Sequence, residues 1–219
     1  MLVDVRRTLL VAICFLLPAG QPLAAQAQSG SHADSHILVC YGDSITAGYG
    51  LDYGQAFPND LQRDLNSQGY HYKVLNRGTS GATTKDALAG LPGILRLHPE
   101  IVIVEFGGND GLRGLPQEDT LSNLDQLLTR LEEAHIKVLL AGITLPMNYG
   151  PGYVRRFQQI FITLDGRHHV AFVPMIYKDL IDVPGTIQED GIHPTAKGSG
   201  MIAETLMPEL APLLRKGRE

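Results

Sequence analysis

The sequence has little cysteine and no excess of positive charge, and each shortage excludes a class of protein. Of its two cysteines, Cys14 lies in an apolar run near the N-terminus and Cys40 in the body of the chain. If that N-terminal run is removed, Cys40 has no intramolecular partner, so we expect no disulfide framework and a small buried apolar residue instead. Only 18 basic side chains stand against 23 acidic ones. No basic stripe is therefore available for a nucleic acid partner.

The common cofactor motifs are also missing. No Gly-x-Gly-x-x-Gly follows a predicted strand. The segment 191–198 departs from a phosphate-binding P-loop, because Ala196 stands at its second glycine position and Gly198 at its serine or threonine position. The nucleophile elbow Gly-x-Ser-x-Gly would need glycine where Thr46 stands. We therefore expect no cofactor and no bound metal.

The N-terminus carries an apolar run that is too short to cross a bilayer. Arg6 and Arg7 precede it at residues 8–17, Pro18 ends it, and Ala-Gln-Ala follows at 25–27. A basic start, a short apolar core and an Ala-x-Ala end are typical of a secretory signal peptide, with an N-terminal membrane anchor as the alternative. Cleavage after the third of these residues predicts a periplasmic or secreted protein without a stable membrane anchor.

The expected mature chain is acidic and has the size of one domain. Removing residues 1–27 takes Asp4, Arg6 and Arg7 from the totals of 18 basic and 23 acidic side chains, which leaves 16 and 22 and a net charge near −6. Residues 28–35 are small and polar, which predicts a flexible lead-in. Residues 36–219 are enough for a single domain with a full core.

Strand and helix patterns alternate along that domain. The clearest strand is 101–106, whose apolar run suits a central parallel strand covered on both faces. His168 and His169 fall at a predicted helix end, where we expect a solvated turn. The alternation predicts a three-layer α/β/α sandwich with a five-stranded parallel sheet and right-handed crossovers. We expect strands at 37–41, 72–76, 101–106, 136–143 and 170–173, and helices at 56–65, 83–97, 116–134, 154–164 and 196–214.

A serine stands almost directly after the first predicted strand. Gly42 ends that strand and Ser44 follows, so the serine would lie at the carboxyl edge of the sheet, where ligands bind in open α/β folds. A Gly-x-Ser sequence is by itself also typical of a turn or a helix N-cap. A nucleophilic role for Ser44 therefore requires a base elsewhere in the chain.

A candidate base lies near the C-terminus. Asp190 and His193 are three residues apart, so a tight turn can place the carboxylate against one ring nitrogen and leave the other free for Ser44. Two alternatives are a helix-capping loop with an incidental histidine and a metal site that includes Glu189. One histidine and two carboxylates make a poor metal set, which favours the catalytic interpretation.

Ester hydrolysis also needs donors for the developing oxyanion. The backbone N–H of Ser44 is one candidate, Gly78 after the second strand another, and the side-chain amide of Asn109 after the third strand a third. Gly78 and Asn109 are each also ordinary turn residues. Together the first three strands would deliver one such group each to the same edge.

These segments resemble the four sequence blocks of the SGNH (GDSL) hydrolase superfamily, in order. The blocks are Gly-Asp-Ser-Ile at 42–45, Gly78, Gly-Gly-Asn-Asp at 107–110 and Asp-Gly-Ile-His-Pro at 190–194. The resemblance covers essentially the whole mature chain and implies a flavodoxin-like α/β fold. It implies that Ser44 is the nucleophile, His193 the base and Asp190 its orienting partner, with an oxyanion hole from Ser44, Gly78 and Asn109.

Two longer segments resemble the secreted arylesterase branch of that superfamily, which includes periplasmic thioesterases and lysophospholipases. They are 107–114 and 145–150. The implied substrates are small-molecule or lipid esters, namely aryl esters, acyl thioesters and lysophospholipids, and we expect a monomer. Leu145, Pro146 and Ile192 are our candidates for the apolar wall of the acyl pocket. The alternatives are a carbohydrate O-deacetylase of the same superfamily and a catalytically silent periplasmic binding module.

Overall fold

The structure is a computed structural model that describes residues 36–216. The predicted signal peptide at 1–27 and the lead-in at 28–35 lie outside the described residues. Within them, strands and helices alternate as the sequence predicts.

The centre of the fold is a five-stranded sheet in which all neighbouring strands are parallel. The strand order is β2-β1-β3-β4-β5, which is the flavodoxin-like doubly wound order. Gly42 pairs with Gly78 on one side and with Glu105 on the other, so β1, β2 and β3 end level with one another. The strands are β1 (His36–Gly42), β2 (Tyr72–Gly78), β3 (Ile101–Glu105), β4 (Lys137–Ala141) and β5 (Ala171–Val173).

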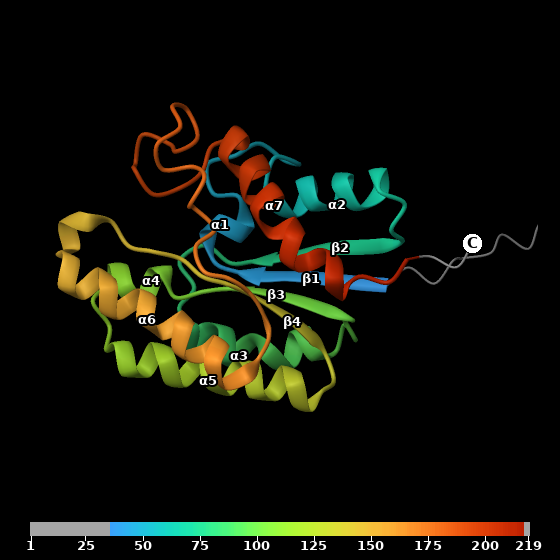
Figure 1. Cartoon of the computed structure of the whole chain (residues 1–219), viewed down its shortest axis with the longest axis horizontal. Coiled ribbons are helices and arrows are strands. Elements are labelled where there is room, and N and C mark those ends of the chain that lie inside the picture. The colour runs from blue at the N-terminus through green and yellow to red at the C-terminus, as the bar shows by residue number, and fades with distance from the viewer. Residues whose placement is uncertain (1–35, 217–219) are drawn as a thin grey trace, which may run out of the picture. The chain divides into compact units, whose positions relative to one another are not determined.

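Helices cover both faces of this sheet (Figure 1). α2 and α7 pack against each other on one face, and α3, α5 and α6 form the opposite layer. β3 is buried along its whole length between these layers, as its apolar sequence predicts. The helices are α1 (Ser44–Ala47), α2 (Phe57–Ser67), α3 (Thr84–Leu95), α4 (Gly108–Leu112), α5 (Gln117–Glu133), α6 (Pro151–His168) and α7 (Ala196–Leu210), with 3-10 turns η1 (Met147–Tyr149) and η2 (Ala211–Leu213).

The local reasons for these elements are visible in the sequence. α2 buries Phe57, Leu61 and Leu65, which recur every four residues and face the core. The side chain of Thr83 accepts from the backbone of Asp86 at the start of α3, and the Asp86 carboxylate accepts from the backbone of Thr83. This reciprocal capping box fixes where α3 begins. Cys40 is fully buried in β1, as predicted.

Several helices differ from the prediction. The short helices α1 and α4 were not predicted, and the two glycines of α4 have low helix propensity. α6 runs from Pro151 to His168 instead of from 154 to 164, and proline is well suited to its first turn. α7 ends at Leu210 and continues as the separate turn η2, whereas the prediction ran to residue 214.

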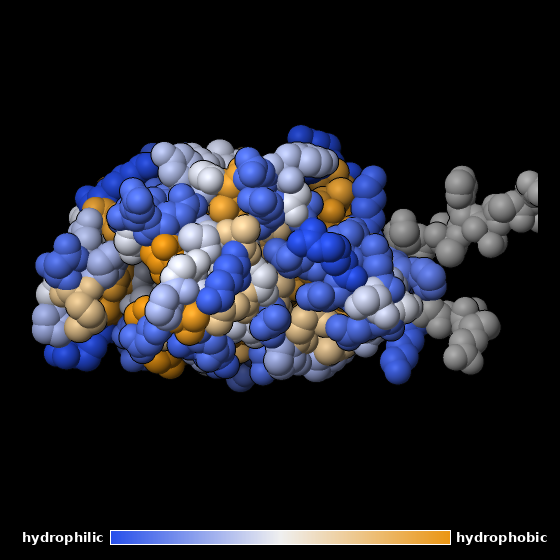
Figure 2. Space-filling view, turned by 90° about the horizontal axis from the view of Figure 1, so that it is seen from above, coloured by the Kyte–Doolittle hydropathy of each residue, from blue (hydrophilic) through white to orange (hydrophobic). Residues whose placement is uncertain are grey.

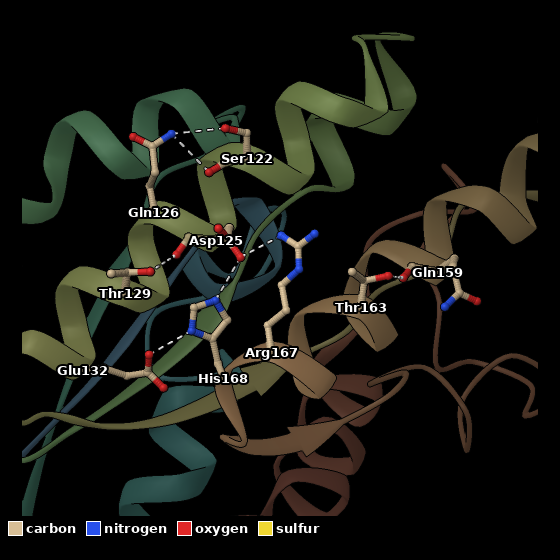
Figure 3. A network of polar contacts seen from close by, with 9 residues as sticks. All are labelled: Ser122, Asp125, Gln126, Thr129, Glu132, Gln159, Thr163, Arg167 and His168. Atoms are coloured by element: carbon tan, nitrogen blue, oxygen red, sulfur yellow. Dashed lines mark hydrogen bonds and ion pairs between the residues drawn. The ribbon is translucent and has the colours of Figure 1, made fainter.

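The prediction for His168 is wrong. Its side chain is only 8% exposed and lies between two carboxylates of α5 (Figure 3). Nδ1 is 2.8 Å from Oε2 of Glu132, and Nε2 is 3.1 Å from Oδ1 of Asp125. Arg167 adds a third contact, with its Nη1 3.0 Å from the same Asp125 oxygen. Burial raises the pKa of Asp125, but the hydrogen bonds from Arg167 and His168 outweigh it, so the net pKa is lowered. His168 therefore joins α6 to α5, while His169 is exposed at the helix end.

The surface of the described domain is mixed. On the face drawn in Figure 2, hydrophobic residues form small separate patches among hydrophilic ones. None of the helices between residues 36 and 216 combines the length and apolarity needed to cross a membrane. The exposed large hydrophobic side chains of this part are Tyr49, Tyr53, Leu115, Met147, Tyr149, Ile162 and Ile181.

Candidate active site

Ser44 lies at the carboxyl end of β1, as the first residue of α1. Asp43 caps this turn by accepting from the N–H of Ile45 at 3.0 Å. Gly42 lets Thr46 and Glu105 approach the backbone closely, because a Cβ atom there would overlap both. The chain therefore leaves the sheet at once and presents Ser44 at the β1/β3 junction, where the direction of strand addition reverses.

The structure brings Asp190 and His193 to this serine. His193 Nε2 lies 2.8 Å from Ser44 Oγ, and His193 Nδ1 lies 2.6 Å from Asp190 Oδ2. The second oxygen of Asp190 accepts from the backbone N–H groups of Ile192 and His193 at 2.9 and 3.0 Å. Burial raises the pKa of Asp190, but these hydrogen bonds, first that from the His193 side chain, lower it overall. The carboxylate is thus held charged and aimed at the imidazole.

Gly78, the last residue of β2, and Gly81, in the turn that follows, have different surroundings. The N–H of Gly78 donates to Oδ1 of Asn76 at 2.9 Å, and Gly78 is absent from the cavity lining described below. Gly81 lines the cavity, and its carbonyl accepts from Nη2 of Arg113 at 2.8 Å. Across residues 36–216, no hydrogen bond has the N–H of Gly81 or of Ser44 as its donor. The N–H of Gly78 is therefore engaged outside the cavity lining, whereas Gly81, which was not among the residues predicted from the sequence, lines the cavity and has an N–H that is free within that range.

Asn109 also reaches the cavity, in α4 just after β3. Its Nδ2 donates to Oδ2 of Asp43 at 3.1 Å and to the carbonyl of Ala82 at 3.0 Å. An amide has two hydrogens, and both are engaged here. Asn109 therefore joins the serine turn to the loop that contains Gly81, and it would have to exchange or share a partner to reach an oxyanion.

The serine opens into a cavity of about 700 Å³. The walls are mainly apolar, and the three predicted wall residues Leu145, Pro146 and Ile192 all line it. A cavity of this size and character suits a small ligand with a large apolar part. Further apolar lining residues are Ile45, Tyr49, Leu112, Ile143, Met147, Met175, Tyr177, Ile181 and Ile187.

The sequence now identifies the family. A family model described as the GDSL-like Lipase/Acylhydrolase family matches residues 40–200. The chain belongs to this family.

Several named proteins and solved structures are similar to most of the chain. "Esterase TesA" of Pseudomonas aeruginosa is 39% identical over 183 residues, which cover 83% of this chain and 91% of the relative. "Thioesterase 1/protease 1/lysophospholipase L1" of Escherichia coli K12 is 36% identical over 183 residues, which cover 83% of this chain and 86% of the relative. The crystal structure of TesA superposes with a TM-score of 0.79, at 39% identity, over 82% of this chain and all of that one. The crystal structure of AlinE4, an SGNH-hydrolase family esterase, superposes with a TM-score of 0.69 at 36% identity. The match covers 83% of this chain and 98% of that one.

Two buried carboxyl groups support the serine turn of this GDSL-like hydrolase from behind. Glu105, at the end of β3, accepts from Thr46 Oγ1 at 2.8 Å and from the N–H of Asp43 at 3.3 Å. Burial, and next the nearby Asp43 carboxylate, raise the pKa of Glu105 well above its usual range. Burial likewise raises the pKa of Asp43 to about 6. A neutral Glu105 beside a charged Asp43 avoids placing two buried negative charges together.

Between residues 36 and 216, no group of three or more histidine, cysteine, aspartate or glutamate side chains is arranged to hold a metal ion. Glu189 makes no contact with the Asp190–His193 pair in the hydrogen bonds and ion pairs of that region. The histidine is instead placed between a carboxylate and a hydroxyl, which is the geometry for general base catalysis.

Proposed function

We propose that Ser44, His193 and Asp190 are the catalytic triad of this ester-hydrolysing enzyme. The chain is an esterase of the GDSL-like family. The observation that carries the assignment of residues is the continuous pair of contacts from Asp190 to His193 and from His193 to Ser44, at 2.6 and 2.8 Å. A nucleophile, a base within hydrogen-bond reach and a group that fixes the base's tautomer are what acyl transfer to serine requires.

In the first half of the reaction, Ser44 Oγ attacks the ester carbonyl while its proton passes to His193 Nε2. The imidazolium that forms is stabilised by the Asp190 carboxylate on Nδ1. The C–O bond to the leaving group then breaks, the leaving oxygen takes the proton from Nε2, and the acyl group stays on Ser44. In the second half, water loses a proton to Nε2 as its oxygen attacks the acyl carbon. The bond between that carbon and Ser44 Oγ then breaks, the acid leaves, and the proton on Nε2 returns to Oγ.

The negative oxygen of each tetrahedral intermediate needs fixed donors. We assign the backbone N–H groups of Ser44 and Gly81 to this role, because both line the cavity and neither has an acceptor among the described residues. Asn109 is the third donor, and it releases or shares the Ala82 carbonyl when the oxyanion forms. This assignment replaces Gly78 of the sequence analysis with Gly81.

The cavity favours esters with an apolar acyl group. Leu145, Pro146 and Ile192 form part of its wall, and burying each methylene of an acyl chain there is favourable by roughly 0.8 kcal/mol. Aryl esters, acyl thioesters and lysophospholipids are the proposed substrate classes. All three classes appear in the names of relatives, as an arylesterase of Vibrio mimicus and a thioesterase/lysophospholipase of Escherichia coli. A carbohydrate O-deacetylase is the alternative, and it would prefer acetyl over longer acyl groups.

We further propose that the protein acts as a monomer in the periplasm or outside the cell. The basis for the location is the signal-peptide pattern of residues 1–27. Its removal would leave residues 28–219, with the hydrolase domain at 36–219. Mass spectrometry of the protein from the periplasm and the medium would identify the first residue of the mature chain, and a protein that keeps residues 1–27 in the membrane fraction would refute the secretion proposal.

Covalent labelling tests the nucleophile. A fluorophosphonate should modify Ser44 in the wild-type protein and leave the Ser44→Ala variant unlabelled, because only a base-activated serine reacts at useful rates. Tryptic mass spectrometry identifies the labelled residue, and hydrolysis of 4-nitrophenyl butyrate is measured in parallel. Ser199, which is also buried, is the matched control: Ser199→Ala should keep both labelling and activity. Unchanged hydrolysis by Ser44→Ala would refute the proposal.

A further inference from the structure

Tyr49 makes contacts with both the turn that contains Ser44 and the loop that contains His193. Its backbone N–H donates to the carbonyl of Ser44 at 3.0 Å. Its ring lies against the imidazole of His193, with the ring centres 4.6 Å apart and the planes inclined by 40°. Tyr49 also lines the cavity and is 54% exposed. Tyr49 thus lies beside the two groups that must exchange a proton.

Gln188 connects Tyr49 to the loop that contains His193 through hydrogen bonds. Its Nε2 donates to the carbonyl of Tyr49 and to that of Pro194, both at 2.8 Å, and its backbone N–H donates to the carbonyl of His193 at 2.8 Å. Tyr49 and Gln188 are 139 positions apart in the chain. Gly50 makes the close approach possible, because it has a φ of +75° and a Cβ there would overlap the Gln188 side chain.

We infer that Tyr49 is a positioning residue for the base, placed by Gln188, and that its ring favours the imidazolium form of His193. The inference rests on the proposed triad. The ring blocks one face of the imidazole, so His193 keeps Nε2 on Ser44 and Nδ1 on Asp190. When Nε2 takes the serine proton, the imidazole becomes a cation within 6 Å of an aromatic ring centre, which is a stabilising cation–π arrangement.

Other groups around His193 do not replace this role. Asp190 on its own loop bonds Nδ1, and Asp43 at the start of α1 acts on His193 through its charge. The hydroxyl of Tyr177 donates to the carbonyl of Ile192 at 2.9 Å and holds the loop backbone, not the ring. Between residues 36 and 216, Tyr49 is the one aromatic side chain paired with the His193 ring.

The test compares Tyr49→Phe and Tyr49→Leu with the wild-type enzyme on 4-nitrophenyl acetate, whose small acyl group makes little use of the cavity. Tyr49→Phe should stay within about twofold of wild type, since the Tyr49 hydroxyl has no partner in the described part of the chain. Tyr49→Leu should lower kcat by about three- to tenfold with KM nearly unchanged, because the stabilised species is the imidazolium. Tyr53→Leu is the matched control, since Tyr53 is fully exposed four residues further on, and it should resemble wild type.

The pH profile of kcat/KM separates this role from a merely structural one. Loss of the ring makes the imidazolium less favourable, so the acid limb should move to lower pH by about half a unit in Tyr49→Leu and stay in place in Tyr49→Phe and Tyr53→Leu. Thermal unfolding establishes that each variant is folded. Wild-type kcat and an unmoved acid limb in Tyr49→Leu would overturn the inference, with a raised KM then identifying Tyr49 as a cavity wall only.

Gln188→Ala extends the test to the residue that places Tyr49. If Gln188 acts through Tyr49, the double variant should lose no more kcat than Tyr49→Leu alone, whereas additive losses would show that it acts independently. The proposed function fails separately: in that case Ser44→Ala keeps wild-type activity. An active wild type, an inactive Ser44→Ala and an unaltered Tyr49→Leu would refute the inference on Tyr49 alone.

Discussion

The side-chain amide of Asn109 donates to the carboxylate of Asp43 across 3.1 Å and so connects the turn after β3 to the turn after β1. Asp43 in turn caps the helix that begins with Ser44. The residue proposed to stabilise the oxyanion is therefore also part of the support of the nucleophile. This double role makes Asn109 the first residue to test.

Replacing Asn109 by alanine should reduce kcat by about 10² to 10³, or roughly 3 to 4 kcal/mol, with little change in KM, because the oxyanion charge exists only in the transition state. The measurement is kcat, KM and Tm on one aryl ester. Asn109→Asp is a useful second variant, since it is nearly isosteric but replaces the amide donor with an acceptor. A large fall in Tm together with near-normal kcat would assign Asn109 to the fold alone.

Gly78 and Gly81 should fail in different ways when each is replaced by alanine. A Cβ at Gly78 would overlap the backbone of Ala47, so Gly78→Ala should mainly lower Tm. Gly81 has a φ of +81° and open space on its Cβ side apart from Arg113. Gly81→Ala should lower the free energy of unfolding by about 1 to 2 kcal/mol through backbone strain. It should also lower kcat more than Gly78→Ala does, because the strained backbone no longer points the Gly81 N–H at the oxyanion. The opposite pattern, with kcat lost at Gly78 and kept at Gly81, would restore the sequence-based assignment.

Glu105 makes the free energy of unfolding depend on pH. Its pKa is raised on folding, so its contribution is fully present below the ordinary carboxyl value of about 4.5 and is lost as pH rises through the folded pKa. The glutamine of Glu105→Gln stays neutral at every pH. The free energy of unfolding of this variant, relative to that of wild type, should therefore rise between about pH 5 and pH 8, and show no such rise near pH 4. Urea unfolding at both ends of this range measures the difference. A constant difference between the two proteins across the range would contradict a neutral buried Glu105.

His193 should be as important as Ser44, because nucleophile and base act as a unit. His193→Ala should lose activity to about the same extent as Ser44→Ala. A chelator such as EDTA should leave hydrolysis unchanged. Inhibition by EDTA that added metal reverses would favour the alternative metal site at 189–193, as would substantial activity in His193→Ala.

The cavity should select for acyl length. In a series from acetyl to palmitoyl 4-nitrophenyl esters, kcat/KM should rise by up to about fourfold per methylene until the cavity is filled. Leu145→Ala removes part of the wall and should flatten this rise, whereas Ile162→Ala, at an exposed position outside the lining, should leave it intact. A preference for acetyl throughout would support the carbohydrate O-deacetylase alternative.

The sequence by itself determined the architecture and the local half of the site. Alternating apolar patterns predict the five strands, because β-strands and helices bury side chains at different periods. The pairing of Asp190 with His193 is also predictable, because a tight turn brings together the side chains of two residues that are three positions apart. Ser44 was predictable from its place after the first strand and from the family blocks around it.

Only the tertiary structure decided how groups far apart in the chain share hydrogen bonds. Gly78 and Gly81 look equivalent in sequence, but the Asn76 side chain occupies one N–H and leaves the other free. The burial of His168 between Asp125 and Glu132 depends on how α5 meets α6. Tyr49 and His193 are in contact although most of the domain's sequence separates them, and no periodic pattern of residues predicts that contact. Such contacts depend on packing between elements, and no local pattern of residues encodes that packing.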